Sequence, residues 1–550
     1  MTLRRMANDS VHWFMGDLTS KIVAESGIPS DRHHLGKILL QSFKDDPDFV
    51  LQIDGATGES ETYASALERT VRCANCLKNL GLQHGDVLIL MAPNHLDVAI
   101  PFYAALYLGV IVGAVDRTLT TNELQQTFAF SKPKIIFCQS DRASDVQLTL
   151  NNLNLDAQIV SFDKGDYLCS FEEFMEQYGD ESSVDDFKCT DFDPEDSPAF
   201  LIATSGTTGL PKAAAVTHKN FAIITPYVWS RFTTFPTPTR LALIGSPLQW
   251  LTAILNFIIS PILKFTRLQT SQTMTPDHAY ELINTYRPTY TIFSPTMMTT
   301  LLNPDERDRC DFTCLELLML GGSAVPQKLV DELKIVSPDT EVLNVYGMSE
   351  LGGVAFHGDN PAPGSCGKPM GCFQYRIIDV ETQQDIYEPN VPGELWIKGP
   401  SVFKEYYNNV EATEETFAED RWFKTGDTFY RDENWNFFFV ERIKLLLKYK
   451  SYQISPVEIE AVIRQHPGVL DVAVTGVPDE ECGDLPVACV VPRPGAEPSA
   501  DEIKDWVKES LSDAKQLRGG VIFVDAIPMT ASTKVHRRKL KQMALEIPKE

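Results

Sequence analysis

Short apolar runs alternate along the chain with longer segments of helical period. Apolar side chains recur every three or four positions over 35–46 and 63–80, which predicts helices. The apolar and β-branched runs 86–91 and 135–138 predict buried strands. Similar helix and strand patterns continue through 96–108, 220–232, 241–246, 277–285 and 290–293. This order is typical of layered α/β proteins whose sheets are mostly parallel.

Two uncharged segments have the length of a membrane span. No charged residue occurs across the 23 residues of 241–263 or the 18 residues of 98–115. The first segment is interrupted by two prolines and holds polar side chains, among them Ser246, Gln249 and Asn256. The second also contains a proline and ends in a β-branched run that resembles a strand. We therefore expect both segments to be buried in the core, with no transmembrane segment.

One loop concentrates the groups that a polyphosphate needs. It reads Thr204-Ser205-Gly206-Thr207-Thr208-Gly209-Leu210-Pro211-Lys212, between the apolar run 200–203 and a possible second strand at 213–216. Backbone N–H groups, hydroxyls and one lysine can there turn toward a common point. The run does not satisfy the G-x-x-x-x-G-K-[ST] pattern of Walker A loops. On composition alone, a plain turn is the alternative.

Further motifs follow downstream. Leu320-Gly321-Gly322-Ser323-Ala324 comes after an apolar run, and two glycines let a backbone approach a flat base closely. Tyr346-Gly347-Met348-Ser349-Glu350 offers a carboxylate, a hard ligand of the type that magnesium takes in proteins. The later motifs are Trp422-Phe423-Lys424-Thr425-Gly426-Asp427, Glu441-Arg442-Ile443-Lys444, Lys448-Tyr449-Lys450-Ser451-Tyr452-Gln453 and Ser532-Thr533-Lys534.

These motifs, taken in order from about Leu35 to Leu540, resemble those of the acyl-adenylate-forming enzymes. That family includes acyl-CoA synthetases, 4-coumarate–CoA ligases, beetle luciferases and the adenylation domains of peptide synthetases. The run from Lys444 to Gln453 looks most like the luciferase-like synthetases of insects and the 4-coumarate–CoA ligases. The resemblance implies an α/β fold. A large N-terminal AMP-binding domain of layered sheets with a β-barrel-like part, residues 1–443, would precede a small mobile α+β domain, residues 444–550.

The resemblance also implies roles for the motif residues. Catalytic roles fall on Lys534, Thr208 and Glu350, and magnesium would be placed by Glu350 and Thr208. ATP or AMP would be bound by Ser205, Gly206, Thr207, Thr208, Gly209, Lys212, Gly321, Gly322, Ser323, Ala324, Tyr346, Gly347, Ser349, Asp427 and Arg442. The acyl pocket would include Gln249, Trp250 and Thr252. CoA binding and the hinge between the domains would involve Lys444, Lys448, Ser451, Tyr452 and Gln453.

The implied activity is that of an ATP-dependent acyl-CoA synthetase with Mg²⁺ as its metal and CoA as co-substrate. A carboxylate would attack the α-phosphorus of ATP to give acyl-AMP and pyrophosphate, and the CoA thiol would then displace AMP. Lys534 would offset the repulsion between the two anions. Trp250 and the apolar stretch 251–259 favour a medium or long fatty acid. If Trp250 closes the pocket, short or aryl acids are favoured instead.

Three other functions remain open. A luciferase-type monooxygenase would add oxygen chemistry to the same adenylate. A peptide-synthetase adenylation module is disfavoured by the lack of a carrier domain after Leu540. A non-catalytic binding relative is disfavoured because five charged motif residues are retained, namely Lys212, Glu350, Asp427, Arg442 and Lys534. Ser451 and Thr533 replace glycines usual in the family, on the CoA path and beside the catalytic lysine.

The composition limits which partners and which cellular compartment are expected. A net charge of −26 disfavours nucleic acids and anionic membranes, since both bind basic surfaces. Eleven scattered cysteines imply no disulfide framework, and Cys73-Ala-Asn-Cys76 lies within an expected helix, where a structural role is favoured. Neither a secretory signal at 1–20 nor a Ser-Lys-Leu-type end at 547–550 is evident. We expect an intracellular protein, peroxisomal as the family suggests, or cytoplasmic. The sequence does not predict the oligomeric state.

Overall fold

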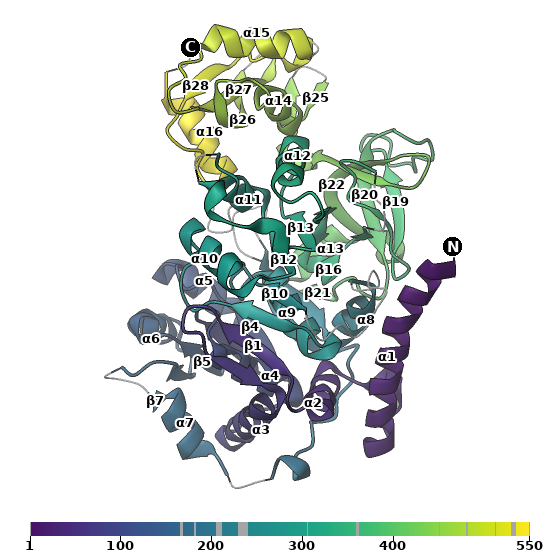
Figure 1. Cartoon of the computed structure of the whole chain (residues 1–550), viewed down its shortest axis with the longest axis vertical. Helices are drawn as coiled ribbons and strands as arrows, with labels where there is room; N and C mark the ends of the chain where they lie inside the picture. Colours follow the sequence, from purple (N-terminus) through teal and green to yellow (C-terminus); the bar gives the residue numbers. More distant parts are fainter. Residues whose placement is uncertain are drawn as a thin grey trace.

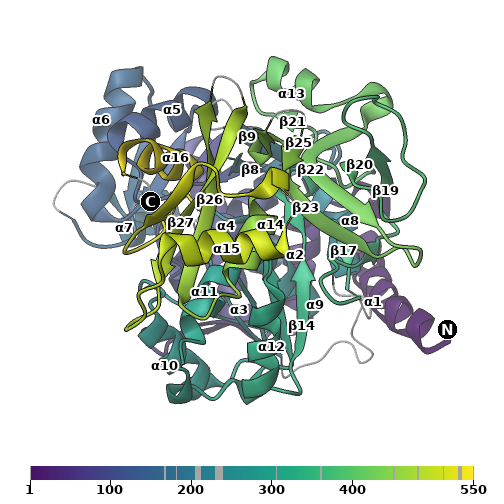
Figure 2. The same ribbon diagram turned by 90° about the horizontal axis from the view of Figure 1, so that it is seen from above.

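The computed structural model describes residues 2–165, 169–180, 183–204, 212–228, 240–304, 306–358, 362–449, 452–479, 482–511, 513–529 and 535–548. Figure 1 shows a large lower body, formed by most of the chain, and a smaller upper body that ends at the C-terminus. Seen from above in Figure 2, the upper body lies over the middle of the large one. This confirms the predicted α/β fold with a large N-terminal and a small C-terminal part.

An eight-stranded sheet carries the strands that flank the predicted phosphate loop. Its order is β21-β9-β8-β4-β3-β5-β6-β7, and it is parallel from β8 to β7, with β9 and β21 added antiparallel. The strands are β3 (Val87–Met91), β4 (Ile111–Ala114), β5 (Ile135–Cys138), β6 (Gln158–Ser161), β7 (Cys169–Ser170), β8 (Pro198–Thr204), β9 (Lys212–Thr217) and β21 (Glu405–Tyr406). The predicted strands at 86–91, 135–138, 200–203 and 213–216 are all present.

A seven-stranded sheet forms the second layer, in the order β14-β13-β12-β10-β11-β1-β2. Its strands are parallel except for β2. They are β1 (Val50–Asp54), β2 (Ser60–Thr62), β10 (Leu241–Leu243), β11 (Thr266–Gln269), β12 (Tyr290–Phe293), β13 (Leu317–Gly321) and β14 (Glu341–Val345). Parallel sheets are covered on both faces, which explains the nearly continuous apolar runs of these strands.

Buried helices account for the two long uncharged segments. All ten residues of α4 (Ala99–Leu108) are buried, and so are eleven residues of α9 (Leu251–Leu263). Both helices share one core cluster with α2 (Leu35–Asp45), α3 (Tyr63–Leu80) and strands of both sheets. Within the described residues, no helix combines the length and the apolar character that a membrane span requires. The prediction of core burial is therefore confirmed.

Further helices cover the sheets or flank them. They are α5 (Thr121–Ser131), α6 (Ala143–Leu153), α7 (Phe171–Tyr178), α8 (His218–Val228), α10 (Pro276–Tyr286), α11 (Pro295–Leu301), α12 (Gln327–Val336) and α13 (Val410–Thr416). The N-terminal helix α1 (Thr2–Ser26) lies along the flank of the large body beside α2 and α8, and we did not predict it. Its buried side chains Val11, Leu18 and Ile22 are widely spaced, so the hydrophobic period is weak.

The antiparallel part predicted as barrel-like is a four-stranded sheet, β19-β20-β22-β23. Its strands are β19 (Gln374–Ile378), β20 (Gly393–Lys398), β22 (Phe423–Arg431) and β23 (Phe437–Arg442). Two hairpin-like pairs connect it to the seven-stranded sheet, β15 (Gly347–Met348) with β16 (Gly353–Val354) and β17 (Phe356–His357) with β18 (Lys368–Pro369).

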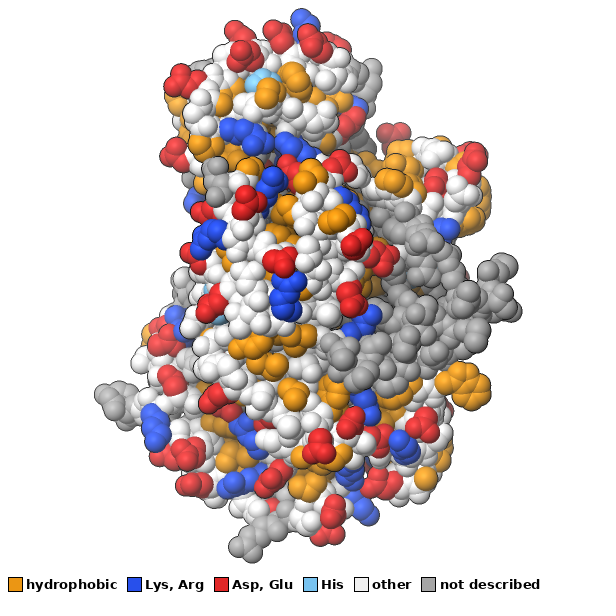
Figure 3. Space-filling view, viewed as in Figure 1, with side chains coloured by type: hydrophobic (Ala, Val, Ile, Leu, Met, Phe, Trp, Pro, Cys, Tyr) orange, Lys and Arg blue, Asp and Glu red, His pale blue; other side chains and the backbone are white. Residues whose placement is uncertain are grey.

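The upper body has its own sheet and its own apolar clusters. Its strands are β24 (Leu447–Tyr449), β25 (Tyr452–Ile454), β26 (Val469–Asp479), β27 (Gly483–Pro492) and β28 (Gly520–Phe523). Its helices are α14 (Pro456–Ile463), α15 (Ala500–Ser510) and α16 (Arg537–Glu546). The domain boundary predicted at residue 443 coincides with a short 3₁₀ turn, Ile443–Leu445, but stays a prediction. Figure 3 shows Lys and Arg side chains gathered on this face where the two bodies meet.

Candidate active site

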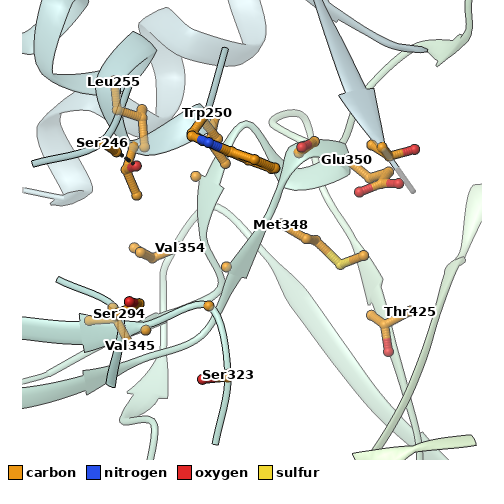
Figure 4. Close-up of a pocket in the computed structure, with 18 of the residues that line it drawn as sticks. Ser246, Trp250, Leu255, Ser294, Ser323, Val345, Met348, Glu350, Val354 and Thr425 are labelled. Atoms are coloured by element: carbon orange, nitrogen blue, oxygen red, sulfur yellow. Dashed lines mark hydrogen bonds between the residues drawn. The ribbon is translucent and has the colours of Figure 1, made fainter. Parts of the chain in front are cut away.

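A cavity of about 800 Å³ opens at the carboxyl ends of parallel strands in the seven-stranded sheet. Gly321 ends β13 and Val345 ends β14, while Ser246 follows β10 and Ser294 follows β12. Ligands of α/β proteins commonly bind at this edge, because the loops after the strands converge there. The volume is that of a small-molecule site. Figure 4 shows side chains from these loops surrounding the open space.

The predicted phosphate loop joins two paired strands beside this cavity. Thr204 ends β8 and Lys212 begins β9, and the two residues pair across the hairpin. Both line the cavity. Ser205, Gly206, Thr207, Thr208 and Gly209 lie outside the described residues, so their predicted contacts with phosphate stay predictions.

Lys212 and Glu350 are connected through a residue that the sequence did not single out. The Tyr406 hydroxyl donates a hydrogen bond of 2.7 Å to Glu350 Oε1, and Lys212 Nζ lies 5.3 Å from the centre of the Tyr406 ring. All three residues line the cavity. Tyr406 reaches this place because β21 pairs with β9, a tertiary contact that local sequence does not reveal.

Glu350 suits one carboxylate ligand of a divalent cation. The side chain is buried, and burial raises the pKa of its carboxyl group. Magnesium is commonly held by one or two carboxylates together with substrate phosphates, and here the strand of the phosphate loop lies nearby. Among the described residues, no group of three or more His, Cys, Asp or Glu side chains could hold a metal ion by itself. The residues present therefore fit a divalent metal ion that is held jointly by Glu350 and by the phosphates of a bound ligand.

Two of the glycines predicted to bind ATP or AMP are also required by close packing against a neighbouring strand. A Cβ at Gly321 would lie 2.7 Å from the backbone oxygen of Val345 on β14, and one at Gly347 would lie 2.5 Å from that of Gly353. The neighbouring strands thus exclude larger residues there. Gly322 has φ of +90°, which disfavours side chains as well. The predicted Gly321, Gly322, Ser323, Gly347 and Ser349 line the cavity, whereas Ala324 is not among its lining residues.

Asp427 is the centre of a hydrogen-bonded group behind the cavity wall. Its side chain is buried, its Oδ2 accepts a hydrogen bond of 2.6 Å from the Tyr346 hydroxyl, and its Oδ1 accepts one of 3.0 Å from Arg442 Nε. The Asp427 charge raises the pKa of Arg442, and burial together with that charge raises the pKa of Tyr346.

Arg442 is the member of this group that reaches the cavity. Arg442 lines the cavity, whereas Tyr346 and Asp427 are not among its lining residues. Contacts of Asp427 and Tyr346 with a nucleotide are therefore predictions that need a change in this wall.

The opposite part of the cavity is mostly apolar. Trp250, Leu251, Leu255 and Ile259 from the start of α9 line it, and Figure 4 shows the Trp250 ring extending from this side toward Glu350. Further apolar lining comes from Met274, Ile292, Phe293, Met297, Met319, Val345, Met348 and Val354. The predicted Thr252 also lines the cavity, whereas Gln249, which precedes α9, is not among its lining residues.

The predicted residues of the small body are described only in part. Lys444 belongs to a 3₁₀ turn, Lys448 to β24, and Tyr452 and Gln453 to β25, but their side chains are not described. Ser451 and Lys534 lie outside the described residues. Met529 and Val535, the described residues on either side of 530–534, form an antiparallel bridge.

Comparison with known proteins places these features in a family. The model of the family described as "AMP-binding enzyme" matches residues 40–407, and that described as "AMP-binding enzyme C-terminal domain" matches residues 458–534. The chain is 32% identical over 505 residues to luciferin 4-monooxygenase of Photuris pensylvanica, covering 88% of this chain and 90% of the relative. It is 30% identical over 523 residues to 4-coumarate–CoA ligase 1 of Narcissus pseudonarcissus, covering 92% and 93%.

Solved structures show the same fold. ATP-bound MatB from Rhodopseudomonas palustris superposes with a TM-score of 0.83 at 24% identity, over 94% of this chain and 99% of that one. The first family model spans more than half of the chain, and the relatives above match along nearly its whole length. The chain therefore belongs to the AMP-binding enzyme family, the adenylate-forming family that has CoA ligases among its members.

Proposed function

We propose that the protein is an ATP-dependent acyl-CoA synthetase that activates a medium- or long-chain fatty acid, or an aryl acid, through acyl-AMP to the CoA thioester. The observation that carries this proposal is the cavity itself. One side presents Lys212, Glu350 and Arg442, and the other presents the apolar lining around Trp250. ATP would bind on the charged side and the apolar acid on the other, so that the two substrates meet between them.

The protein would act mainly by positioning and by stabilising charge. Lys212 and the loop 205–209 would hold the β- and γ-phosphates of ATP, while Arg442 and Asp427 would fix the ribose. Glu350, held by Tyr406, would place a Mg²⁺ ion, which supplies charge neutralisation at the phosphates when bound. Lys534 would lie between the attacking carboxylate and the α-phosphate and reduce their repulsion.

The second half-reaction would use the small body. In this proposal the domain 444–550 turns about Lys444, which withdraws Lys534 and brings 448–453 to the path of the CoA thiol. The eleven cysteines are all unpaired, which supports a reducing compartment inside the cell, cytoplasmic or peroxisomal. Nucleic acids are not proposed as partners, because the net charge is −26.

A luciferase-type monooxygenase is the second candidate function. The similarity to the luciferin 4-monooxygenase of Photuris pensylvanica supports it. That reaction would use the same adenylate and would add molecular oxygen. Light emission on addition of luciferin, ATP and magnesium in air, without CoA, would favour this candidate over the ligase.

An acid panel tests the proposed function most simply. We expect pyrophosphate release to depend on ATP, magnesium and an acid, and acyl-CoA to form only when CoA is also present. Activity should rise from acetate toward decanoate, because each buried methylene is worth about 0.8 kcal/mol. Absence of pyrophosphate release with every fatty and aryl acid would refute the ligase. Equal rates with acetate and decanoate would refute the apolar acyl pocket.

A further inference from the structure

A buried amide side chain lies in the mostly apolar wall of the cavity. Asn256 lies on α9 among cavity-lining residues, one helical turn after Thr252 and next to Leu255. Its side chain is 4% exposed, so it is almost completely removed from water. A buried amide is unfavourable unless its polar atoms are hydrogen-bonded. The partners of its two polar atoms therefore indicate what this position is for.

The amide of Asn256 is half satisfied. Its Nδ2 donates a hydrogen bond of 2.8 Å to the backbone oxygen of Thr252. Its Oδ1 is buried and has no hydrogen-bond partner among the described residues. An orphaned buried acceptor of this kind is destabilising. The helix therefore provides a partner for Nδ2 but none for Oδ1.

The orientation of this amide follows from its partner. A backbone carbonyl can only accept a hydrogen bond, so the atom that faces the oxygen of Thr252 must be the NH₂ group. The remaining atom is then the oxygen, which can only accept. A ligand that satisfies Asn256 must therefore bring a donor, a hydroxyl or an N–H. An ether, a ketone or a carboxylate would add a second acceptor and would be disfavoured.

Among the described residues, none of the neighbouring polar groups donates a hydrogen bond to Asn256 Oδ1. Thr252 and Ser246 also line the cavity, and their hydroxyls are hydrogen-bonded to each other at 2.7 Å. The rest of this wall is formed by apolar side chains such as Leu255 and Ile259. The χ2 angle of asparagine has a broad distribution of allowed values, so the Asn256 amide can turn toward a bound donor at little cost.

We infer that Asn256 selects carboxylic acids that carry a hydroxyl or amino group on an otherwise apolar chain or ring. This inference rests on the proposed function, since it names the acid of that same reaction. An acid without such a group leaves Asn256 Oδ1 unpaired in the complex. An acid that carries one pairs it, in surroundings where water does not compete.

Matched acids test the inference. Two sets serve, octanoic acid with its terminal hydroxy and methoxy analogues, and cinnamic acid with its para-hydroxy and para-methoxy analogues. The methyl ethers keep an oxygen but cannot donate. In at least one set, we expect kcat/KM for pyrophosphate release to be about tenfold higher for the hydroxy acid than for the other two. A hydroxy acid that is never preferred would overturn the inference.

A variant assigns the preference to this side chain. Asn256→Leu keeps the branched shape and removes the acceptor, so the ratio of kcat/KM for the hydroxy acid to that for the plain acid should fall to about one. Asn256→Ser, which shortens the side chain, should reduce the preference as well and serves if the leucine variant does not fold. A uniform loss with all acids would show that Asn256 only packs the helix, and would overturn the inference.

Binding separates this inference from the proposed function. The shift in melting temperature caused by each acid is measured with ATP present, for the wild-type protein and both variants. If no acid is adenylated, the proposed function fails, and the inference is still decided by binding. It then requires a larger shift with a hydroxy acid than with its methyl ether, present in the wild-type protein and lost in Asn256→Leu.

Discussion

At the scale of single residues, the account depends on the buried carboxylate of Asp427. It is bonded to Arg442 and Tyr346, and in the proposed complex it also binds the ribose. Asp427→Ala should weaken ATP binding by about 10- to 100-fold, because a hydrogen bond to a charged group is worth about 1.5–3 kcal/mol. The dissociation constant of ATP, measured by titration calorimetry, gives the result directly.

The chain offers a matched control for this variant. Asp385 forms a two-bonded pair with Arg376, at 2.6 and 2.7 Å, in the region of the same antiparallel sheet. Asp385 does not line the cavity. Asp385→Ala removes an Asp–Arg pair without touching the proposed site, and ATP affinity should not change. Equal effects of the two substitutions would mean that Asp427 serves only the stability of this sheet.

At the scale of elements, histidines tie the starts of α2 and α8 to the acidic connection before β8. His34, which precedes α2, stacks on Phe192 at 4.0 Å, and His218, the first residue of α8, packs against the same ring at 4.8 Å. Burial lowers the pKa of His34 to about 3 and that of His218 well below its usual value. Phe187 and Cys189, in the acidic connection 183–196 before β8, are also buried.

This packing predicts acid lability. Below about pH 6.5 the unfolded chain protonates both histidines while the folded protein does not, so the free energy of unfolding falls as the pH falls. Each group contributes at most about 1.4 kcal/mol per pH unit. His34→Gln keeps a donor for the backbone oxygen of Thr190 and cannot titrate.

Urea unfolding midpoints between about pH 7.5 and 5 provide the measurement. His34→Gln should lose less stability over this range than the wild-type protein. His12→Gln, which makes the same exchange at an exposed histidine, supplies the control. An acid dependence identical in all three proteins would rule out the histidine packing as its cause.

At the scale of the whole molecule, the sequence was sufficient for elements whose patterns are local. The prediction was close for the helices at 35–46 and 63–80 and for the apolar strands. Their buried faces require apolar side chains at regular intervals, and this period is visible in the sequence. The helix α1 was not predicted, since it buries few side chains among those described. The motif residues Lys212, Glu350 and Arg442 do meet at one cavity.

Features that depend on pairing between distant segments could not be predicted from the sequence. Tyr406 joins Glu350 only because β21 adds to the edge of β9. Asn256 was visible only as a polar interruption of an apolar run, and its orphaned oxygen depends on the packing of α9. Gln249 and Ala324 were placed in the site by their neighbours in sequence, but the backbone does not bring them to the cavity lining.

The central claim is that one chain performs two half-reactions, with Lys534 needed only for the first. Lys534→Ala should slow pyrophosphate release from acid and ATP by about 10²–10³-fold, the effect of losing one preorganised electrostatic contact. Acyl-CoA formation from supplied acyl-AMP should remain nearly unchanged, because no anion–anion repulsion then exists. The measurement is the ratio of these two rates in the variant and in the wild-type protein. An equal loss in both steps would contradict the two-step account.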